Sequence, residues 1–210
     1  MNLVSQLAEG IADLGLTLPH ETSARLLQYL ALVRKWGQVY NLTAVCQPEA
    51  MLTQHLFDSL VVLPHMVGSR IADVGSGAGL PGIPLALVRP DWHIVLLESN
   101  QKKAAFLQQA RIELGLKNVE VIEGRVENFH PTEKFNTVIS RAFSSLVVFV
   151  RLAGHLCREG DGKGVIVAMK GASPQEDLAQ FPEQFVIDKV LPIVVPGLAA
   201  KRHLVLIKRA

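Results

Sequence analysis

Cysteine is scarce in this chain. Only Cys46 and Cys157 occur among 210 residues, and neither belongs to a C-x-x-C pair or to a cysteine–histidine cluster. Two isolated thiols offer neither a disulfide framework nor a zinc site. We therefore predict that the protein holds no metal and works in a reducing cellular compartment.

Long hydrophobic runs and a cationic leader are absent as well. Every apolar segment is far shorter than the roughly 20 residues that a membrane-spanning helix needs. The first residues include Glu9 and Asp13 in place of a basic start, which argues against a secretory signal peptide. We expect a soluble, cytoplasmic protein with no membrane partner.

Neither sign of charge dominates. The 21 basic and 19 acidic side chains give a net charge of +2 at pH 7. This balance neither demands nor excludes a nucleic-acid partner, so any RNA-binding surface must come from local clustering. Hydrophobic residues make up 49% of the chain, enough for the core of one or two domains. Nothing in the composition requires a partner chain, and we expect a monomer.

The pattern of the chain changes near residue 68. Before that point apolar residues recur at helical spacing, beginning with Leu3, Leu7 and Ile11. Beyond it, strand-like runs alternate with helical ones, which is typical of a parallel sheet covered on both faces. We predict an α/β protein with a helical cap at 1–68. The cap packs on a Rossmann-like domain at 69–210, which has a mostly parallel seven-stranded sheet with helices on both faces.

The same patterns predict the individual elements. In the cap, Thr22 or Ser23 begins the second helix, Gly37 ends it, and Pro48 opens the next one. In the domain, helices are expected to begin near residues 84, 102 and 146. The expected strands are 71–74, 94–97, 119–122, 135–140 and 165–169, followed by an antiparallel pair at 186–195 and 203–207.

The most informative stretch is the glycine-rich loop after the first predicted strand. Gly75, Gly77 and Gly79 stand at alternate positions, just after a strand that contains Asp73. Glycine lets the backbone turn sharply and lets a ligand approach it closely. Glu98 ends the second predicted strand, where a carboxylate can bind both hydroxyls of a ribose. The strand, loop and following helix therefore predict a nucleotide-type cofactor site.

Two classes of cofactor fit this loop. The segment from Gly77 to Gly82 satisfies the G-x-G-x-x-G pattern of dinucleotide sites. Asp73, however, would repel a pyrophosphate and attract the ammonium of S-adenosylmethionine, which carries no phosphate. We therefore favour S-adenosylmethionine over NAD. In the alternative interpretation, Asp73 only caps the next helix or binds loop amides, which either cofactor allows.

Six short segments in register resemble a known family: Tyr40–Thr43, His55–Leu60, Val74–Pro84, Ser140–Ala142, Lys170–Gly171 and Arg202–Leu204. Nearly the whole chain resembles the RsmG (GidB) family of bacterial methyltransferases, which act on N7 of a guanine in small-subunit (16S) ribosomal RNA. The resemblance implies the class I methyltransferase fold and S-adenosylmethionine as the cofactor. Glu98 matches the ribose-binding acid, which is often Asp in such proteins. The other cofactor contacts that the resemblance implies are Gly75, Leu80, Val126, Glu127 and Arg141.

Motifs of other methyltransferase chemistries are missing. After the fourth predicted strand stands Ser140-Arg141-Ala142-Phe143, where amino-group methyltransferases carry an Asn/Asp-Pro-Pro-aromatic motif, and no Pro-Cys nucleophile occurs. Guanine N7 has a free lone pair, so its methylation requires alignment but no general base. Arg141 is then the candidate positioning residue, acting on the methionine carboxylate, guanine O6 or a phosphate. Alternatively, Arg141 forms a structural salt bridge with Asp58 or Glu127.

Polar residues of the cap are candidates for the substrate side of the site. His55, Asp58 and Ser59 share one helix face. They form either a lid over the cofactor or a polar network that locks the cap to the domain. Asn41 contacts the base or the cofactor, or it caps the next helix.

Four basic residues of the domain are further candidates. Lys170 follows the fifth predicted strand and Arg202 precedes the last, and we predict that both contact RNA. Lys102 and Lys103 begin a helix, where the helix dipole does not favour cations. They either extend the basic surface or are simply solvated.

The residues alone leave three other functions open. These are an NAD-dependent oxidoreductase, a non-enzymatic RNA-binding factor, and a methyltransferase with a small-molecule or protein acceptor. The short chain lacks a clear second mononucleotide-binding half, which argues against the first, and the intact glycine loop argues against the second. Only the resemblance selects 16S ribosomal RNA. With so little net charge, we expect the assembled small subunit, or an assembly intermediate, to be the substrate.

Overall fold

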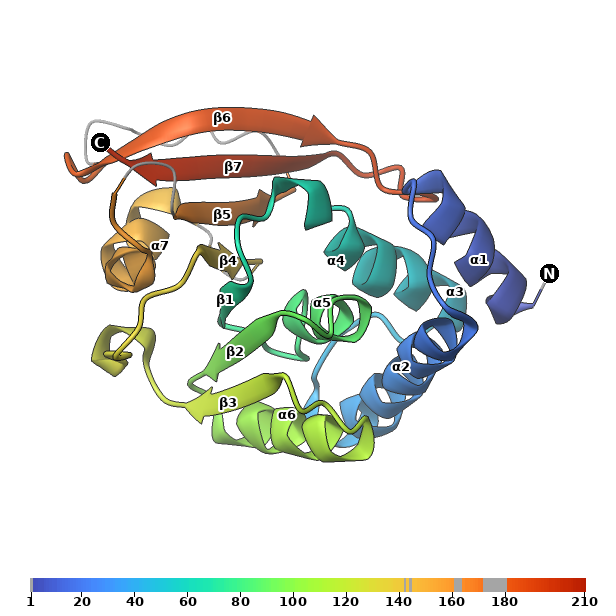
Figure 1. Cartoon of the computed structure of the whole chain (residues 1–210). Helices are drawn as coiled ribbons and strands as arrows, with labels where there is room; N and C mark the ends of the chain where they lie inside the picture. Colours follow the sequence, from blue (N-terminus) through green and yellow to red (C-terminus); the bar gives the residue numbers. More distant parts are fainter. Residues whose placement is uncertain (1, 142, 144, 161–163, 172–180) are drawn as a thin grey trace.

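A central seven-stranded sheet organises the chain in the computed structural model, which describes all residues except 1, 142, 144, 161–163 and 172–180 (Figure 1). The strand order is β3-β2-β1-β4-β5-β7-β6. The first five strands pair in parallel, whereas β7 runs antiparallel to both β5 and β6. The predicted fold class is therefore confirmed. Because β7 lies between β5 and β6 and is antiparallel to both, the strand order also differs from the 3-2-1-4-5-6 order of dinucleotide-binding sheets.

The strand bounds agree closely with the sequence prediction. One difference is at β4, which begins two residues later than predicted because Phe135 forms only an isolated bridge with Cys157. The strands are β1 Arg70–Val74, β2 His93–Glu98, β3 Val119–Glu123, β4 Thr137–Ser140, β5 Val165–Lys170, β6 Phe185–Ile193 and β7 Arg202–Arg209.

Helices precede the sheet and fill most of its connections. The segment before β1 holds α1 Leu3–Asp13, α2 His20–Tyr40, α3 Pro48–Met51, the π-helical η1 Leu52–Phe57, α4 Asp58–Leu60 and the 3₁₀ turn η2 Leu63–His65. The sheet connections hold α5 Gly82–Val88, α6 Gln101–Glu113, η3 Val126–Asn128, α7 Leu146–Ala153 and η4 Gly154–Leu156.

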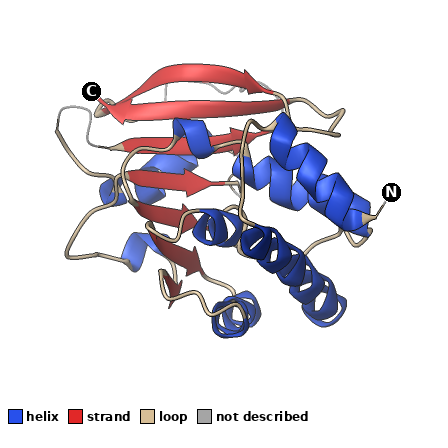
Figure 2. Ribbon diagram, turned by 45° about the vertical axis from the view of Figure 1, so that its right-hand side comes forward, coloured by secondary structure: helices blue, strands red, loops and turns tan. Residues whose placement is uncertain are grey.

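Each face of the sheet packs against its own set of helices (Figure 2). Successive side chains of a strand point to opposite faces. Accordingly, Ile71 of β1 lies in one core cluster, with residues of α1, α2, η1, α5 and α6, whereas Ala72 and Val74 lie in the other, with residues of α7. Burial on both sides explains why the inner parallel strands are largely apolar, whereas the edge strand β3 carries exposed Glu120 and Glu123.

The N-terminal helices share a core with the sheet. Leu26 and Val33 of α2 belong to the same buried cluster as Ile71, and the buried hydroxyl of Tyr29 donates a 2.6 Å hydrogen bond to the carbonyl of Ala78 in the glycine loop. These contacts support the predicted packing of residues 1–68 on the sheet. The division of the chain at residue 68 stays a prediction.

The predicted bounds of α2 were wrong at both ends. The helix begins at His20 with Pro19 at its N-cap, so Thr22 and Ser23 lie inside it. It also continues through Gly37, because one interior glycine costs only about 1 kcal/mol relative to alanine, which buried contacts of the helix offset.

Asn41 does not cap the next helix, which was one of its two predicted roles. It ends α2 instead, with φ of 51° and its backbone N–H on the carbonyl of Gly37. Asparagine tolerates this left-handed conformation better than most residues, which suits it to a C-cap. The next helix, α3, has Gln47 at its N-cap with no side-chain hydrogen bond, and Pro48 opens it as predicted.

Candidate active site

The glycine loop joins β1 to α5 in left-handed backbone geometry. Gly75, Gly77 and Gly79 have φ of 71°, 58° and 87°, a region in which side chains are strained. Gly79 also meets a packing limit, since an added Cβ would lie 2.5 Å from Cδ1 of Ile83. Gly79 thus serves the close packing of the loop on α5, and it lines none of the cavities described below.

Asp73 lies behind the glycine loop, away from the cavities that could hold a ligand. Its side chain is fully buried, and Oδ2 accepts a 2.9 Å hydrogen bond from the amide of Gly82 at the start of α5. It lines none of the three cavities around the loop. The geometry supports the alternative in which the carboxyl group holds a loop amide, and the contact with a cofactor ammonium stays a prediction.

Burial of Asp73 should make the stability of the protein pH-dependent. Desolvation raises the pKa of this carboxyl group from 3.8 to about 7. The folded state therefore holds a proton that the unfolded state has lost, so stability falls as pH rises from about 4 to about 7. We expect the wild type to lose stability relative to Asp73→Asn over this window, by at most about 1.4 kcal/mol per pH unit. Urea unfolding of both proteins at several pH values measures this, and parallel profiles would contradict it.

Glu98 closes the loop from the end of β2. Oε2 accepts a 2.8 Å hydrogen bond from the amide of Gly77, and Oε1 accepts one of 2.8 Å from the amide of Asn100. The side chain is nearly buried. Its position at the strand end is as predicted, while ribose binding by it stays a prediction.

A first cavity, the strand-end cavity, extends from Gly75 across the carboxyl ends of β2 and β3. It has a volume of about 170 Å³. Its walls combine apolar side chains with an ion pair between Arg125 and Glu127, whose Nη1 and Oε1 lie 3.7 Å apart. Gly75, Val126 and Glu127 are thus brought together, as the resemblance implied. Sequence reasoning missed six of its other lining residues: Leu97, Ser99, Gly124, Arg125, Phe143 and Leu152.

A second cavity, the loop cavity, lies on the other side of Gly75. It has a volume of about 200 Å³ and is lined by the loop from Gly75 to Leu80 without Gly79. Leu42, Thr43, Lys103 and Arg141 complete its wall. The predicted residues Gly77 and Leu80 therefore line the same cavity as Arg141.

A third cavity, the arginine cavity, lies between η1 and the ends of β5 and β7. It is the largest of the three, at about 460 Å³, and it shares Thr43 and Arg141 with the loop cavity. Among the described residues that line it, three are cationic and one is a carboxylate. The predicted substrate-side residues that it brings together are His55, Asp58, Lys170 and Arg202.

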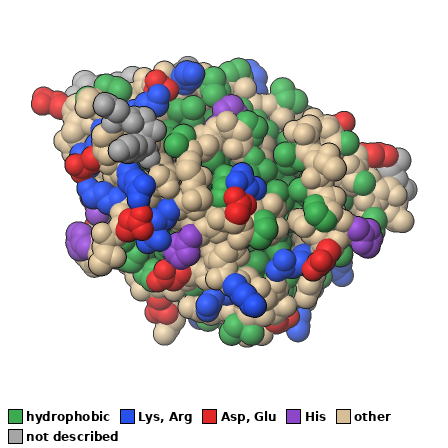
Figure 3. Space-filling model, viewed as in Figure 1, with side chains coloured by type: hydrophobic (Ala, Val, Ile, Leu, Met, Phe, Trp, Pro, Cys, Tyr) green, Lys and Arg blue, Asp and Glu red, His purple; other side chains and the backbone are tan. Residues whose placement is uncertain are grey.

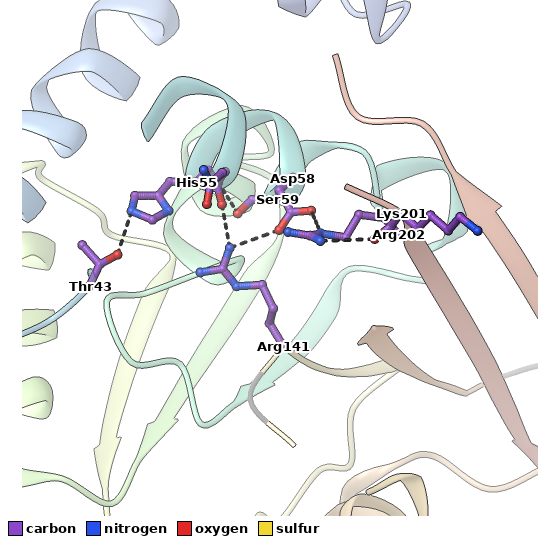
Figure 4. Close-up of polar contacts among 8 residues, drawn as sticks. Thr43, His55, Asp58, Ser59, Arg141, Lys201 and Arg202 are labelled. Carbon is purple, nitrogen blue, oxygen red and sulfur yellow. Dashed lines mark hydrogen bonds and ion pairs between the residues drawn. The ribbon is translucent and has the colours of Figure 1, made fainter. Parts of the chain in front are cut away.

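A buried carboxylate organises this cavity (Figure 4). Asp58, 2% exposed, accepts from Nη1 of Arg141 at 3.2 Å and from Nε of Arg202 at 2.8 Å. Nη1 of Arg141 also donates to the carbonyl of Gln54 at 2.8 Å. The segment after β4 and the start of β7 are thereby joined to the N-terminal helices. Both predicted alternatives, a salt bridge of Arg141 and a locking polar network, correspond to this geometry.

His55 lies in the π-helical turn η1, which the sequence did not distinguish from an α-helix. Its Nε2 lies 3.2 Å from Oγ1 of Thr43, and Ser59 donates to its backbone carbonyl. Burial lowers the pKa of His55 below its ordinary value, so the imidazole is neutral at neutral pH. Such π-helical turns often occur at functional sites.

Three further predicted residues are Lys170, Asn41 and Ala142. Lys170 at the end of β5 donates to the carbonyl of Phe143 at 3.2 Å. Asn41 is exposed and lines none of the three cavities. The predicted motif residue Ala142 lies outside the described residues.

No group of three metal-ligating side chains occurs among the described residues. Within the same part of the chain, no helix combines the length and apolar character needed to cross a membrane.

Solved structures with a similar fold include several methyltransferases. TrmN from Thermus thermophilus matches with a TM-score of 0.55 and 16% identity, over 76% of this chain and 48% of that one. Precorrin-6y C5,15-methyltransferase from Geobacter metallireducens matches with a TM-score of 0.54 and 14% identity, over 82% of this chain and 92% of that one. At these identities the likeness establishes the fold alone, which is that of class I methyltransferases.

Sequence relatives define the family. A family model described as rRNA small subunit methyltransferase G matches residues 22–205. Ribosomal RNA small subunit methyltransferase G of Nitrosospira multiformis is 64% identical over 214 residues, covering 100% of this chain and 99% of the relative. Its counterpart in Nitrosomonas eutropha is 53% identical over 211 residues, covering 99% and 98%. The chain belongs to the ribosomal RNA small subunit methyltransferase G family, as its sequence motifs implied.

Proposed function

We propose that this protein transfers the methyl group of S-adenosylmethionine to N7 of a guanine in 16S ribosomal RNA. The observation that carries the proposal is that three neighbouring cavities at the glycine loop and at Arg141 share lining residues. Gly75 lines both the strand-end cavity and the loop cavity, and Thr43 and Arg141 line both the loop cavity and the arginine cavity. A donor and an acceptor can therefore meet beside Arg141, and family membership supplies the reaction.

The strand-end and loop cavities fit S-adenosylmethionine in chemistry. The apolar wall of Leu97, Val126 and Phe143 suits a purine ring, and Glu127 is a hydrogen-bond acceptor beside it. The polar loop cavity suits the methionine end of the cofactor. When bound, the cofactor supplies a methyl group on a cationic sulfur.

The arginine cavity fits a nucleotide acceptor. Arg141, Lys170 and Arg202 present donors to phosphate oxygens and to guanine O6, while Asp58 is occupied by the two guanidinium groups. Because N7 carries a lone pair, the residues have no proton to remove and act by orienting the base. Arg141 is the proposed positioning residue, since it lines both the loop cavity and the arginine cavity.

The alternative functions are less well supported. The antiparallel β7 inside the sheet argues against an NAD-dependent oxidoreductase. Family membership favours an RNA acceptor over a small molecule or a protein.

We further propose that the substrate is the small subunit or an assembly intermediate, and that the protein acts as a cytoplasmic monomer. On the face shown in Figure 3, basic side chains lie among acidic ones. Together with the net charge of +2, this favours recognition of a preformed RNA shape over attraction to RNA in general. Equal rates on deproteinised RNA and on intact subunits would contradict this part of the proposal.

The methyl-transfer proposal is tested with small subunits from cells that lack this protein. We expect incorporation of tritium from labelled S-adenosylmethionine, and mass-spectrometric mapping should place the methyl group on a guanine as 7-methylguanosine. Gly75→Asp serves as the inactive control. Incorporation no higher than that of the control, or methylation at an atom other than N7, would overturn the proposal.

A further inference from the structure

Lys103 is a cation without a counter-charge at the edge of the loop cavity. Its side chain is half-buried in the first turn of α6, and it lines this cavity with Gly77 and Arg141. Its ammonium group makes no hydrogen bond or ion pair with any residue that the structure describes. Its neighbour Lys102 is exposed and lines none of the three cavities.

The local structure holds Lys103 in an unfavourable place. Oδ1 of Asn100 accepts hydrogen bonds from the amides of Lys102 and Lys103, at 3.1 and 3.2 Å, which fixes the first turn of α6. The positive end of the helix dipole repels a cation at this position. Residues that are locally unfavourable for stability, such as a lysine at this helix end, are expected at functional sites, where the function requires them.

The charges around the loop cavity favour an anion. Lys103 and Arg141 line it, and no carboxylate side chain does so among the described residues. The two nearby acids face other partners, since Asp73 is fully buried behind the loop and the carboxylate of Glu98 accepts from two backbone amides. Nη1 of Arg141 is shared between Gln54 and Asp58. Lys103 therefore has the cationic charge that is least neutralised.

We propose that Lys103 binds the carboxylate of the methionine moiety of S-adenosylmethionine. The inference rests on the proposed function, in which the adenosine occupies the apolar strand-end cavity and the methionine end crosses Gly75 into the loop cavity. The carboxylate is the anionic group of that end. Lys103 would thus recognise the carboxylate of the cofactor, whereas the sequence analysis predicted that Asp73 recognises the cofactor's ammonium group.

Three nonreactive ligands separate this contact from other effects. S-Adenosylhomocysteine keeps the whole amino-acid end, its decarboxylated analogue keeps only the ammonium, and 5′-methylthioadenosine lacks both groups. In calorimetry, we expect Lys103→Gln to weaken binding of S-adenosylhomocysteine about tenfold, which is typical of one lost charge-assisted hydrogen bond. Binding of the other two ligands should be unchanged. Lys102→Gln, which removes the same charge one residue away, should bind all three like the wild type.

The outcomes are distinct. Equal weakening for all three ligands, or for both variants, would show a structural or long-range charge effect and would overturn the inference. Unchanged binding of S-adenosylhomocysteine by Lys103→Gln would overturn it as well, and weaker RNA binding in that variant would then assign Lys103 to a phosphate. These results leave the proposed function intact. Failure of the wild type to bind any of the three ligands would instead overturn the proposed function, and this inference with it.

Discussion

Replacing Gly75 by Asp is expected to abolish cofactor binding. Gly75 has a left-handed φ of 71° and lines both the strand-end cavity and the loop cavity, so the proposed cofactor would cross it. A side chain at this position strains the backbone and adds bulk and negative charge where the ligand passes. We expect the affinity for S-adenosylhomocysteine, measured by calorimetry, to fall more than about 100-fold, and methyl transfer to small subunits to fall to background.

A matched control separates this effect from backbone strain. Gly115, just after α6, also has positive φ, at 59°, and a Cβ there would meet no atom within 4 Å. Gly115→Asp should therefore share the strain of Gly75→Asp but keep cofactor binding. If Gly75→Asp bound the cofactor like the wild type, the position of the cofactor across the loop would be wrong.

The second large effect is expected at Asp58. Asp58→Asn removes the buried charge that holds Arg141 and Arg202, leaving two guanidinium groups without their shared partner. Breaking a buried ion pair costs about 3–5 kcal/mol, and because both arginines are partly exposed we expect a loss of about 2–3 kcal/mol. Methyl transfer should fall as well, since both arginines line the arginine cavity. Urea unfolding and the tritium assay measure the two effects.

An exposed ion pair provides the control for Asp58. Asp91 also accepts two hydrogen bonds from an arginine, Arg89, at 2.9 and 2.6 Å, but on the surface. Exposed pairs contribute little to stability, so Asp91→Asn should change stability far less than Asp58→Asn and leave methyl transfer unchanged. Similar losses in the two variants would show that burial of Asp58 is not the cause.

The sheet was predictable because its strands are short, apolar and separated by clear turn residues. Glycine spacing and the acids at strand ends located the loop, because those features are local in sequence. Helix ends were less predictable. The π-helical form of η1 and the passage of α2 through Gly37 depend on packing against the sheet, which no local pattern records.

The sequence predicted many individual residues of the site, but fewer of the contacts between residues that are distant in sequence. Arg141, Asp58 and Arg202 were each recognised, yet their joint contact links residues up to 144 positions apart in sequence. For Asp73, its charge favoured a contact with the cofactor ammonium, and the sequence could not show that its carboxyl group is buried and accepts from the amide of Gly82. Lys103 was left undecided, since its separation from the solvated Lys102 depends on the rotation of one helix.

The place of β7 in the sheet has a consequence for shortened forms of the chain. It is the last strand in sequence but pairs on both sides, with β5 and with β6. Truncation before Arg202 would therefore leave β5, an almost wholly buried strand, with an unpaired apolar edge. Such edges recruit strands from other molecules. Truncated chains should consequently aggregate, and not merely lose one wall of a cavity.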